Sequence, residues 1–465
     1  MRTEETSGRS HPDVASKVIG RLYRLQRLVR PSCRPTMLAY QRGLRFRIES
    51  TGMSEDEKRE WVIRRLRYSV RKAYTETVYY RKLFSQVGFD PWSDFDFDDF
   101  GRLPVLDRQD IYQAGHALVS GSVARSQLRK ESTGGTTGQP TELWIGPEER
   151  GWQESGFEYY MQRLGVPWGA RIGLLWGHHL DPVASDRLRD RLRDLVTNTR
   201  WFDCFRLSAV VLARYHRELA DWQPRCVIAY ASALGALAEE VRTYGRRPNY
   251  PTRCFVTGAE KLMPHHRSLI QSVFDRPVYE RYGGRDIGLV GFQMDSPRTL
   301  DFEVDWANVL VEPETASDKC AILVTKLHGD GMPMIRYRVG DIGRFPMGSR
   351  PGHQTFILHE VLGRDVERIW LDETKWIHGN EFPHMMKDYP VREFQVVQHA
   401  DLSVTIRVVP RSDFSDRDSK SILATVCANI PGHKVHLEFV EEIPRTVSHK
   451  LRPVISQVDG RGPRM

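Results

Sequence analysis

The sequence has few of the features that mark membrane, secreted or zinc-binding proteins. It contains no run of about 18 apolar residues, so no membrane-spanning helix is expected. Residues 1–16 lack an apolar stretch, which argues against a secretory signal peptide. The six cysteines form no CxxC pair, so neither a zinc site nor a disulfide framework is predicted. A reducing, cytoplasmic compartment is the simplest expectation.

Acidic residues are missing from one long segment near the N-terminus. Between Lys17 and Arg47 there are nine basic residues and no acidic ones. Apolar residues recur at helical spacing within 17–30, which predicts a basic amphipathic helix. This helix could contact an acidic partner or a membrane surface, or it could pack against the body of the protein. The net charge of +8 favours anionic substrates but is too dispersed to indicate nucleic-acid binding.

Strand-like and helical runs alternate after the N-terminal segment, which is typical of layered α/β folds. Short buried strands and helices are expected in turn over residues 171–274, and a β-rich section over 301–345. Further strands then surround a helix at 419–430, which indicates an α+β unit. The sequence therefore predicts a multi-domain α/β protein with a disordered N-terminus at 1–16, a large domain over 17–360 and a small domain over 361–465.

The segment from Ser132 to Pro140, STGGTTGQP, is the most informative stretch of the chain. Glycine lets the backbone adopt positive φ and approach a ligand closely. Successive N–H groups in such a turn form a concave anion-binding surface. The segment lacks the lysine of a Walker A loop, so it predicts a phosphate loop of another kind. The alternative interpretation is an ordinary solvent-exposed loop.

Three later segments combine a glycine turn with a charged or aromatic side chain. Phe255 to Glu260 is a strand that ends in a tight turn, and ligands of α/β sheets collect at such strand ends. Tyr282 to Asp286, YGGRD, offers a ring that can stack on a base and a carboxylate that can hold Mg²⁺. Residues 335–341, IRYRVGD, end in Asp341, a possible acceptor for ribose hydroxyls with arginine beside it. Taken singly, each segment is also compatible with an ordinary strand corner or hairpin turn.

Lys450 lies in a polar loop near the C-terminus, within the segment 443–452. It could deliver a positive charge to a carboxylate and an α-phosphate during attack, or it could simply be solvated. His178 and His179 are adjacent, so their side chains point different ways on most backbones. A metal shared between these two histidines is not expected.

In their order along the chain, these segments resemble the adenylate-forming superfamily of acyl-CoA ligases, acid-adenylating domains and luciferases. The resemblance is strongest to the phenylacetate-CoA ligase branch, which includes CapK-like proteins. Tyr80 to Phe84, Gly88 to Pro91 and Leu103 to Asp107 are similar to its N-terminal signature. The resemblance implies a large N-terminal domain and a small, mobile C-terminal domain. It also implies that an acid and ATP form an acyl-adenylate and pyrophosphate, after which a thiol such as CoA displaces AMP.

The resemblance implies a role for each matching residue. Lys450, Asp286 and Arg338 would be catalytic, and Asp286 and Thr137 would hold Mg²⁺. The ATP site would consist of Ser132, Thr133, Gly134, Gly135, Thr136, Thr137, Gly138, Gly258, Ala259, Glu260, Tyr282, Gly283 and Asp341. The acid site would consist of Tyr230, Ser232, Gly284 and Arg285. The implied partners are ATP with Mg²⁺, a small aromatic or acyl carboxylic acid, and an acceptor that is CoA, a carrier-protein thiol or an amine.

Several positions depart from the family pattern. Asp286 replaces a glutamate, Arg285 replaces a hydroxyl residue, and His449 replaces a glycine beside Lys450. The hinge acid is displaced by one position, to Asp365. These departures leave two alternatives open: an amide ligase with an amine acceptor, and a relative that binds a nucleotide or acyl group without turnover.

Overall fold

A computed structural model describes most of the chain: residues 33–133, 141–177, 198–204, 207–295, 299–364, 368–372, 376–378, 381–386, 389–444 and 454–458. Four predictions fall outside these ranges: the disordered N-terminus, the basic helix at 17–30, the glycine loop from Gly134 to Gly138, and Lys450. The His178–His179 pair also lies outside them. Among the described helices, none is both long and apolar enough to cross a membrane.

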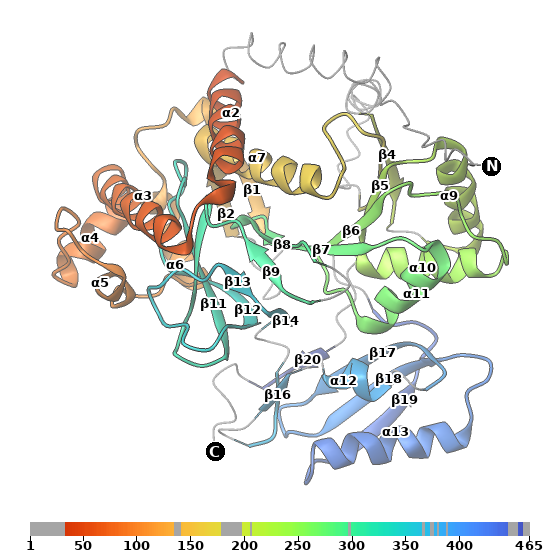
Figure 1. Ribbon diagram of the computed structural model, residues 1–465. Helices are drawn as coiled ribbons and strands as arrows, with labels where there is room; N and C mark the ends of the chain where they lie inside the picture. Colours follow the sequence, from red (N-terminus) through yellow and green to blue (C-terminus); the bar gives the residue numbers. More distant parts are fainter. Residues whose placement is uncertain are drawn as a thin grey trace, which may run out of the picture.

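The first part of the described chain is helical and packs on one flank of the molecule (Figure 1). The long helix α3 begins with a capping box between Ser54 and Glu57 and buries Val62, Leu66 and Val70 at helical spacing. The N-terminal helices are α2 (Arg34–Glu49), α3 (Glu55–Glu76), α4 (Val78–Gln86), α5 (Phe97–Gly101) and α6 (Arg108–Ala114), with 3₁₀ helices at Ser50–Gly52, Gly115–Leu118 and Arg125–Gln127.

A large sheet forms the centre of the molecule and runs in the order β13-β9-β8-β7-β6-β5-β3-β4. Its strands are β3 (Ile172–Trp176), β4 (Thr199–Asp203), β5 (Cys226–Tyr230), β6 (Cys254–Gly258), β7 (Val278–Gly284), β8 (Gly288–Gln293), β9 (Phe302–Val304) and β13 (Ile357–Leu358). The five strands β4, β3, β5, β6 and β7 are parallel to one another. The pairs β7–β8, β8–β9 and β9–β13 are antiparallel. The predicted alternation of strand and helix is confirmed.

Both faces of the parallel part are covered by helices (Figure 1). Successive residues of a strand point to opposite faces, so Val227 and Ala229 belong to a different apolar cluster from Cys226 and Ile228. The first pair packs with residues of α9 (Ala209–Trp222), α10 (Ala231–Arg242) and α11 (Pro264–Phe274). The second pair packs with Tyr160 of α7 (Pro147–Arg163). The α7 face and the α10 face are therefore distinct environments.

A second, antiparallel sheet has the order β10-β11-β12-β14 and corresponds to the predicted β-rich section. Its strands are β10 (Val309–Pro313), β11 (Lys319–Lys326), β12 (Tyr337–Arg344) and β14 (Glu360–Arg364). The segment around Leu106 joins it beside Tyr337, so the last part of the predicted N-terminal signature lies against this sheet. Within this sheet the buried Arg336 donates to Glu312 at 3.1 Å.

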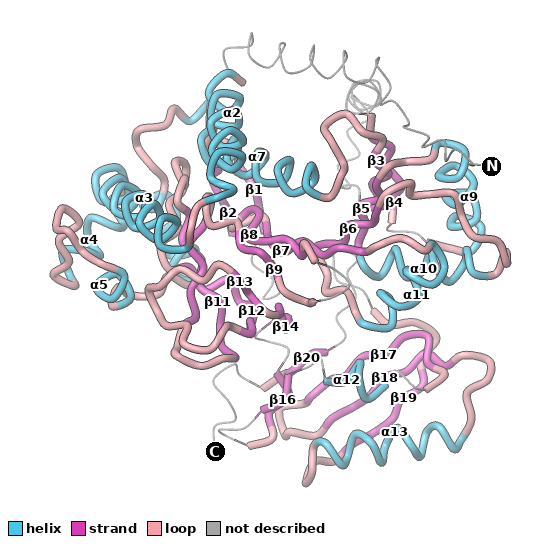
Figure 2. The backbone as a smooth tube through the Cα atoms, in the orientation of Figure 1, coloured by secondary structure: helices cyan, strands magenta, loops and turns pink. Residues whose placement is uncertain are grey.

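The C-terminal part has its own sheet, in the order β19-β18-β17-β20, with α13 beside it (Figures 1 and 2). Its elements are β15 (Arg368–Trp370), β16 (Trp376–His378), α12 (Glu381–Met386), β17 (Val391–Gln398), β18 (Val404–Pro410), α13 (Asp416–Asn429), β19 (Val435–Phe439) and β20 (Val454–Ser456). An ion pair of 3.3 Å joins Arg411 to Glu239 of α10.

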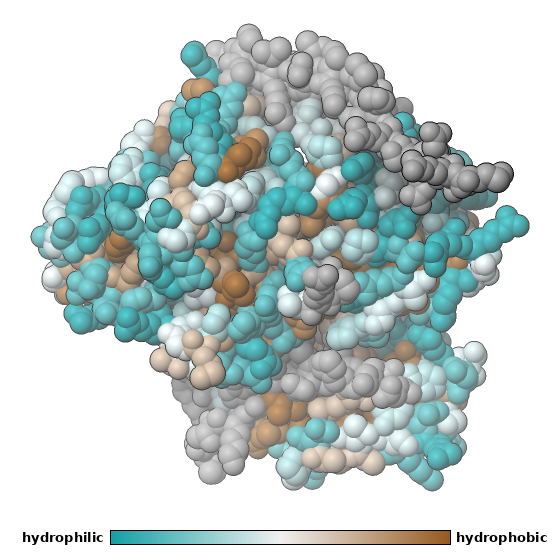
Figure 3. Space-filling model, viewed as in Figure 1, coloured by the Kyte–Doolittle hydropathy of each residue, from teal (hydrophilic) through white to brown (hydrophobic). Residues whose placement is uncertain are grey.

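The visible face of the molecule is mainly hydrophilic, with small separate hydrophobic patches (Figure 3).

Candidate active site

The parallel strands end at one edge of the large sheet, where four positions form a row. Trp176 ends β3, Tyr230 ends β5, Gly258 ends β6, and Arg281 lies near the end of β7. The strand registers place these positions side by side and on the same face of the sheet. The rings of Trp176 and Tyr230 are 4.2 Å apart. This edge is where ligands bind in open α/β sheets, so the row marks a candidate site.

Glu260 follows β6 and connects the predicted ATP residues to the predicted acid residues. Ala259 adopts a φ of 66°, which turns the chain directly after Gly258. The Glu260 carboxylate then accepts the N–H of Ser232 at 3.0 Å. Ser232 lies in the first turn of α10, where an N–H has no partner within the helix, so the carboxylate stabilises this helix end. Burial, with Glu260 as a lesser cause, raises the pKa of Tyr230 to about 12.

The two predicted nucleotide residues Tyr282 and Asp341 meet directly. The Tyr282 hydroxyl donates to Oδ2 of Asp341 at 2.8 Å. Arg364 holds the same carboxylate from the other side, with Nε 3.3 Å from Oδ1. Arg364 also donates to the carbonyl of Val339 at 3.1 Å. The sequence predicted roles for Tyr282 and Asp341 from separate motifs, and the structure brings them together across two sheets.

Asp286 lies just beyond β7 and is only 8% exposed. Its Oδ2 accepts the Tyr337 hydroxyl at 3.0 Å. Burial and the Asp286 charge raise the pKa of Tyr337, and Arg108 opposes the increase. The turn that carries Asp286 requires glycine, because a Cβ on Gly283 would collide with the carbonyl oxygen of Gly288.

The Asp286 carboxylate suits a Mg²⁺ ion that also binds phosphates. In nucleotide sites Mg²⁺ is usually held by one or two carboxylates together with phosphate oxygens. Within the described ranges, no group of three or more His, Cys, Asp or Glu side chains could hold a metal ion by itself. Asp286 is a single buried carboxylate with one oxygen oriented by Tyr337. It therefore fits a Mg²⁺ ion that is also bound by phosphate oxygens, and not a metal site made of protein side chains alone.

Other predicted residues lie at different places around this edge. Gly284 and Arg285 are exposed in the turn before Asp286. Arg285 is near enough to Tyr230 to oppose the rise in its pKa, which places the two predicted acid residues near each other. Arg338 forms an ion pair with Glu314. Because Arg338 follows Tyr337 in β12, it points to the opposite face from the hydroxyl that binds Asp286.

The glycine loop is framed by a hairpin. Strands β1 (Arg129–Thr133) and β2 (Thr141–Ile145) are antiparallel, and Ser132 and Thr133 pair in register with Glu142 and Thr141. Their backbones therefore belong to the strand that leads into the loop. The predicted phosphate contacts of the loop residues, and the role of Lys450, stay predictions.

Three residues of this edge received no role from the sequence: Tyr337, Arg364 and Arg281. Tyr337 lies within the segment IRYRVGD at 335–341. The sequence signal for its role was its place beside apolar residues expected to be buried in a strand. Arg364 belongs to the hinge segment, but its contact with Asp341 depends on the pairing of β12 with β14. Arg281 directly precedes Tyr282, yet its neighbours come from β3, β6 and α7.

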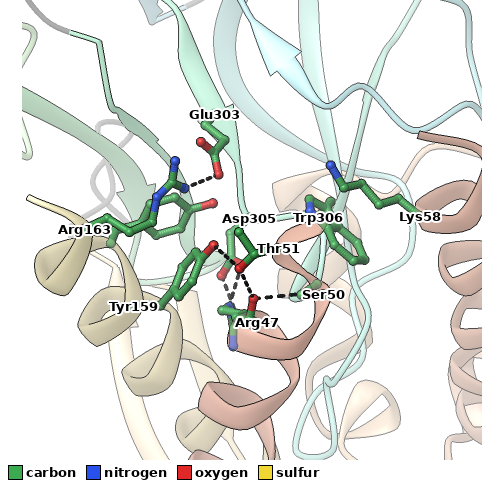
Figure 4. Close-up of a pocket in the computed structure, with 11 residues that line it drawn as sticks. Arg47, Ser50, Thr51, Lys58, Tyr159, Arg163, Glu303, Asp305 and Trp306 are labelled. Carbon is green, nitrogen blue, oxygen red and sulfur yellow. Dashed lines mark hydrogen bonds and ion pairs between the residues drawn. The ribbon is translucent and has the colours of Figure 1, made fainter. Parts of the chain in front are cut away.

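A different pocket lies between α2, α3, the end of α7 and the segment after β9 (Figure 4). Its charged side chains are largely paired. Arg47 binds Asp305 through two hydrogen bonds of 2.9 and 2.8 Å, and Arg163 binds Glu303 at 2.5 Å. Lys58 lies 5.8 Å from the ring centroid of Trp306. The pocket contains none of the predicted site residues, and its pairs join α2 and α7 to β9 and the segment after it.

Glu280 provides a testable pH dependence close to the site. Burial raises the pKa of Glu280 to about 7, against the N–H of Leu262 and the charge of Arg267, which favour the ionised form. A raised pKa means that the folded state favours the protonated acid. This contribution to the free energy of unfolding is fully present below the unfolded-state pKa of about 4.5. It is lost as the pH rises through the folded-state pKa of about 7.

The Glu280→Gln variant is expected to remove this dependence, because an amide of the same shape stays neutral. The variant should gain free energy of unfolding relative to the wild type when the pH rises from about 5 to about 8. The expected gain is up to about 3 kcal/mol. Urea unfolding at the two pH values measures the difference. The exposed Glu441→Gln change serves as the control. An equal effect of Glu280→Gln at both pH values would contradict the assignment.

Comparison with known proteins finds similarity over much of the chain. A family model described as the CapK C-terminal domain matches residues 369–457. The phenylacetate-coenzyme A ligase of Pseudomonas putida is 23% identical over 352 residues, which cover 72% of this chain and 76% of that protein. The phenylacetate-coenzyme A ligase of Escherichia coli K12 is 22% identical over 376 residues, which cover 76% of this chain and 80% of that protein.

Solved structures show the same fold. A 2-hydroxyisobutyryl-CoA ligase in its postadenylation state, in complex with R3-HIB-AMP, superposes with a TM-score of 0.68 at 19% identity. The match covers 87% of this chain and 90% of that chain. The predicted layered α/β fold and the predicted resemblance are thereby confirmed. With the ordered motifs, these similarities support the predicted resemblance to the adenylate-forming superfamily, in its phenylacetate-CoA ligase and CapK-like branch.

Proposed function

We propose that this protein is an ATP-dependent, AMP-forming acid–thiol ligase. The observation that carries the proposal is the pair of linked contacts at one sheet edge: Tyr282 with Asp341, and Tyr337 with Asp286. Asp341 offers two oxygens for ribose hydroxyls, and Asp286 offers a carboxylate for a phosphate-bound ion. Both side chains are oriented by a tyrosine hydroxyl, so the site is preorganised for a nucleotide.

The first half-reaction joins a small carboxylic acid to AMP. A carboxylate oxygen attacks the α-phosphorus of ATP, the bond to the β-phosphate oxygen breaks, and pyrophosphate leaves. Two anions must meet, so cations and N–H groups have to surround them. Asp286, with Thr137 of the glycine loop, would hold Mg²⁺, which neutralises phosphate charge when bound. Lys450 would contribute a further positive charge at the carboxylate and the α-phosphate.

The second half-reaction transfers the acyl group. A thiol of CoA attacks the carbonyl carbon of the acyl-adenylate, the thioester forms, and AMP leaves. The relatives at 22–23% identity are named as CoA ligases, which supports a thiol acceptor over an amine. Arg285 is compatible with this chemistry, since it is exposed in its turn and does not occlude the Asp286–Tyr337 contact.

We further propose that the chain divides near residue 360 into the predicted large and small domains. Two observations support this division. β14 ends the second sheet at Arg364, and the family match to the CapK C-terminal domain begins at residue 369. The small domain would change its orientation between the two half-reactions, with the segment after Arg364 as the hinge.

Acid-dependent exchange of labelled pyrophosphate into ATP tests the proposed function. The expected result is exchange that requires both Mg²⁺ and a carboxylic acid, and that rises above the acid-free rate for at least one acid of a broad panel. Addition of CoA should then convert the acid into a thioester, which mass spectrometry identifies. Absence of exchange with every acid, for protein whose folding is confirmed by thermal denaturation, would overturn the proposal. Exchange followed by amide formation and no thioester would correct the acceptor.

A further inference from the structure

Arg281 is the arginine in the row of four residues where the parallel strands end, and its side chain lies along this row. Gly258 stands beside it on β6, and a Cβ there would lie 2.8 Å from Nε of Arg281. The guanidinium uses this free space to extend along the row. Its central carbon lies 5.2 Å from the ring centroid of Trp176 and 5.2 Å from that of Phe157. Arg281 is therefore half-buried between two aromatic rings.

The guanidinium has no acidic partner in the part of the chain that the structure describes. Some buried or half-buried arginines are paired with acids: Arg47 with Asp305, Arg336 with Glu312, and Arg267 with Glu280. Others, such as Arg65 and Arg225, donate to backbone carbonyls. Around Arg281 no carboxylate forms an ion pair or a hydrogen bond within the described residues. Cations are rarely buried without a partner, so the site is built for an anion that arrives with a ligand.

The electrostatics of the surrounding groups agree with this reading. Burial lowers the pKa of Arg281 to about 10, so the guanidinium stays charged at neutral pH. Tyr230 and Cys226 are the titratable groups that oppose this decrease. Burial raises the pKa of both, so neither carries a negative charge at neutral pH.

The position of Arg281 separates it from the nucleotide. Arg281 and Tyr282 are consecutive in β7, so their side chains point to opposite faces of the sheet. Tyr282 reaches Asp341, the predicted ribose residue. Arg281 points to the α7 face, where it contacts Phe157, and the strand registers place it in the same row as Tyr230, a predicted acid-site residue. An anion bound by Arg281 therefore belongs to the acid substrate and not to ATP.

We propose that Arg281 binds a second carboxylate of the substrate, and that the acid activated by this protein is a small dicarboxylic acid. This inference rests on the proposed function. The planar guanidinium can bind a carboxylate through two parallel hydrogen bonds, and its contacts with the two rings hold it in place. Trp176, Tyr230 and Phe157 enclose the acid between its two carboxylates, which limits its size.

Pyrophosphate exchange with matched acids tests the inference. Each pair has the same carbon skeleton and differs by one carboxylate: succinate with butyrate, glutarate with valerate, and 4-carboxyphenylacetate with 4-methylphenylacetate. The wild type is expected to use the best diacid at least about 10-fold more efficiently in kcat/KM than its monoacid partner. Arg281→Met keeps the length of the side chain and removes its charge. It should lower kcat/KM for that diacid by about 100-fold and leave the monoacid within a few-fold.

Three further variants sharpen this test. Arg281→Lys keeps the charge without the planar fork and should retain part of the diacid preference. Gly258→Ala should disturb the preference as well, because the added methyl group occupies the space that Arg281 uses. Arg242→Met removes an exposed arginine of α10 and should change neither acid.

The outcomes separate this inference from the proposed function. A wild type that exchanges with monoacids and discriminates against every diacid overturns the dicarboxylate assignment while the ligase function stands. An equal loss of both acids in Arg281→Met also overturns it, since Arg281 would then act on the shared carboxylate or on folding. Absence of exchange with all acids overturns the function and this inference together. The comparison of acids on the wild type needs no variant to fold.

Discussion

The Asp286→Asn variant is expected to exchange pyrophosphate about 100- to 1000-fold more slowly than the wild type. Asparagine has the shape of aspartate and can still accept the Tyr337 hydroxyl, so the fold around the turn should persist. It lacks the negative charge that holds a phosphate-bound Mg²⁺. The loss should therefore appear as a higher Mg²⁺ concentration for half-maximal exchange, together with a lower maximal rate. Exchange assays across a Mg²⁺ titration measure both.

Tyr337→Phe is the matched control for this prediction. It removes only the hydroxyl that orients the carboxylate, so the expected loss is smaller, about 10- to 100-fold. Thermal denaturation separates this effect from unfolding, since Tyr337 is fully buried and its ring remains in the phenylalanine variant. If Asp286→Asn exchanges at the wild-type rate with the wild-type Mg²⁺ dependence, Asp286 does not hold the ion.

The carboxyl edge of the large sheet could be predicted because its signals are local. Tyr230 and Gly258 each end a short buried strand, the first followed directly by a helix and the second by a turn, and parallel strands bring such ends together. The glycines at 283 and 284 marked a tight turn before Asp286, and steric contact at this turn confirms that requirement. The order of the motifs along the chain then indicated which family the sequence resembles, although no single motif was specific enough to do so.

The contacts within the site could not be predicted because they depend on pairing between distant strands. Alternation along β7 is visible in the sequence, but which neighbour Arg281 meets depends on the register of β6 and β7. The contact of Arg364 with Asp341 likewise requires β14 to pair with β12. Long-range register is set by the packing of whole layers, so sequence periodicity identifies the strand and not its partner.

The C-terminal lysine provides the second large effect. Lys450→Ala is expected to lower the rate of acid-dependent pyrophosphate exchange by about 100- to 1000-fold. Attack of a carboxylate on ATP brings two anions together, and one positive charge aimed at both stabilises the charge that develops between them. Thioester formation from a preformed acyl-adenylate and CoA should stay within a few-fold of the wild type, because the triphosphate has already left. Parallel assays of the two half-reactions measure this split.

A second lysine of the same C-terminal part provides the control. Lys434 is exposed before β19, and Lys434→Ala removes an equal charge without the predicted role. It should leave both half-reactions unchanged, which excludes a general effect of net charge. His449→Gly adds a comparison at the neighbouring position and should preserve exchange, since it restores backbone freedom beside Lys450. An unchanged exchange rate in Lys450→Ala would show that the lysine of the adenylation step lies elsewhere in the chain. Equal losses in both half-reactions would instead assign Lys450 to the folding or docking of the C-terminal part.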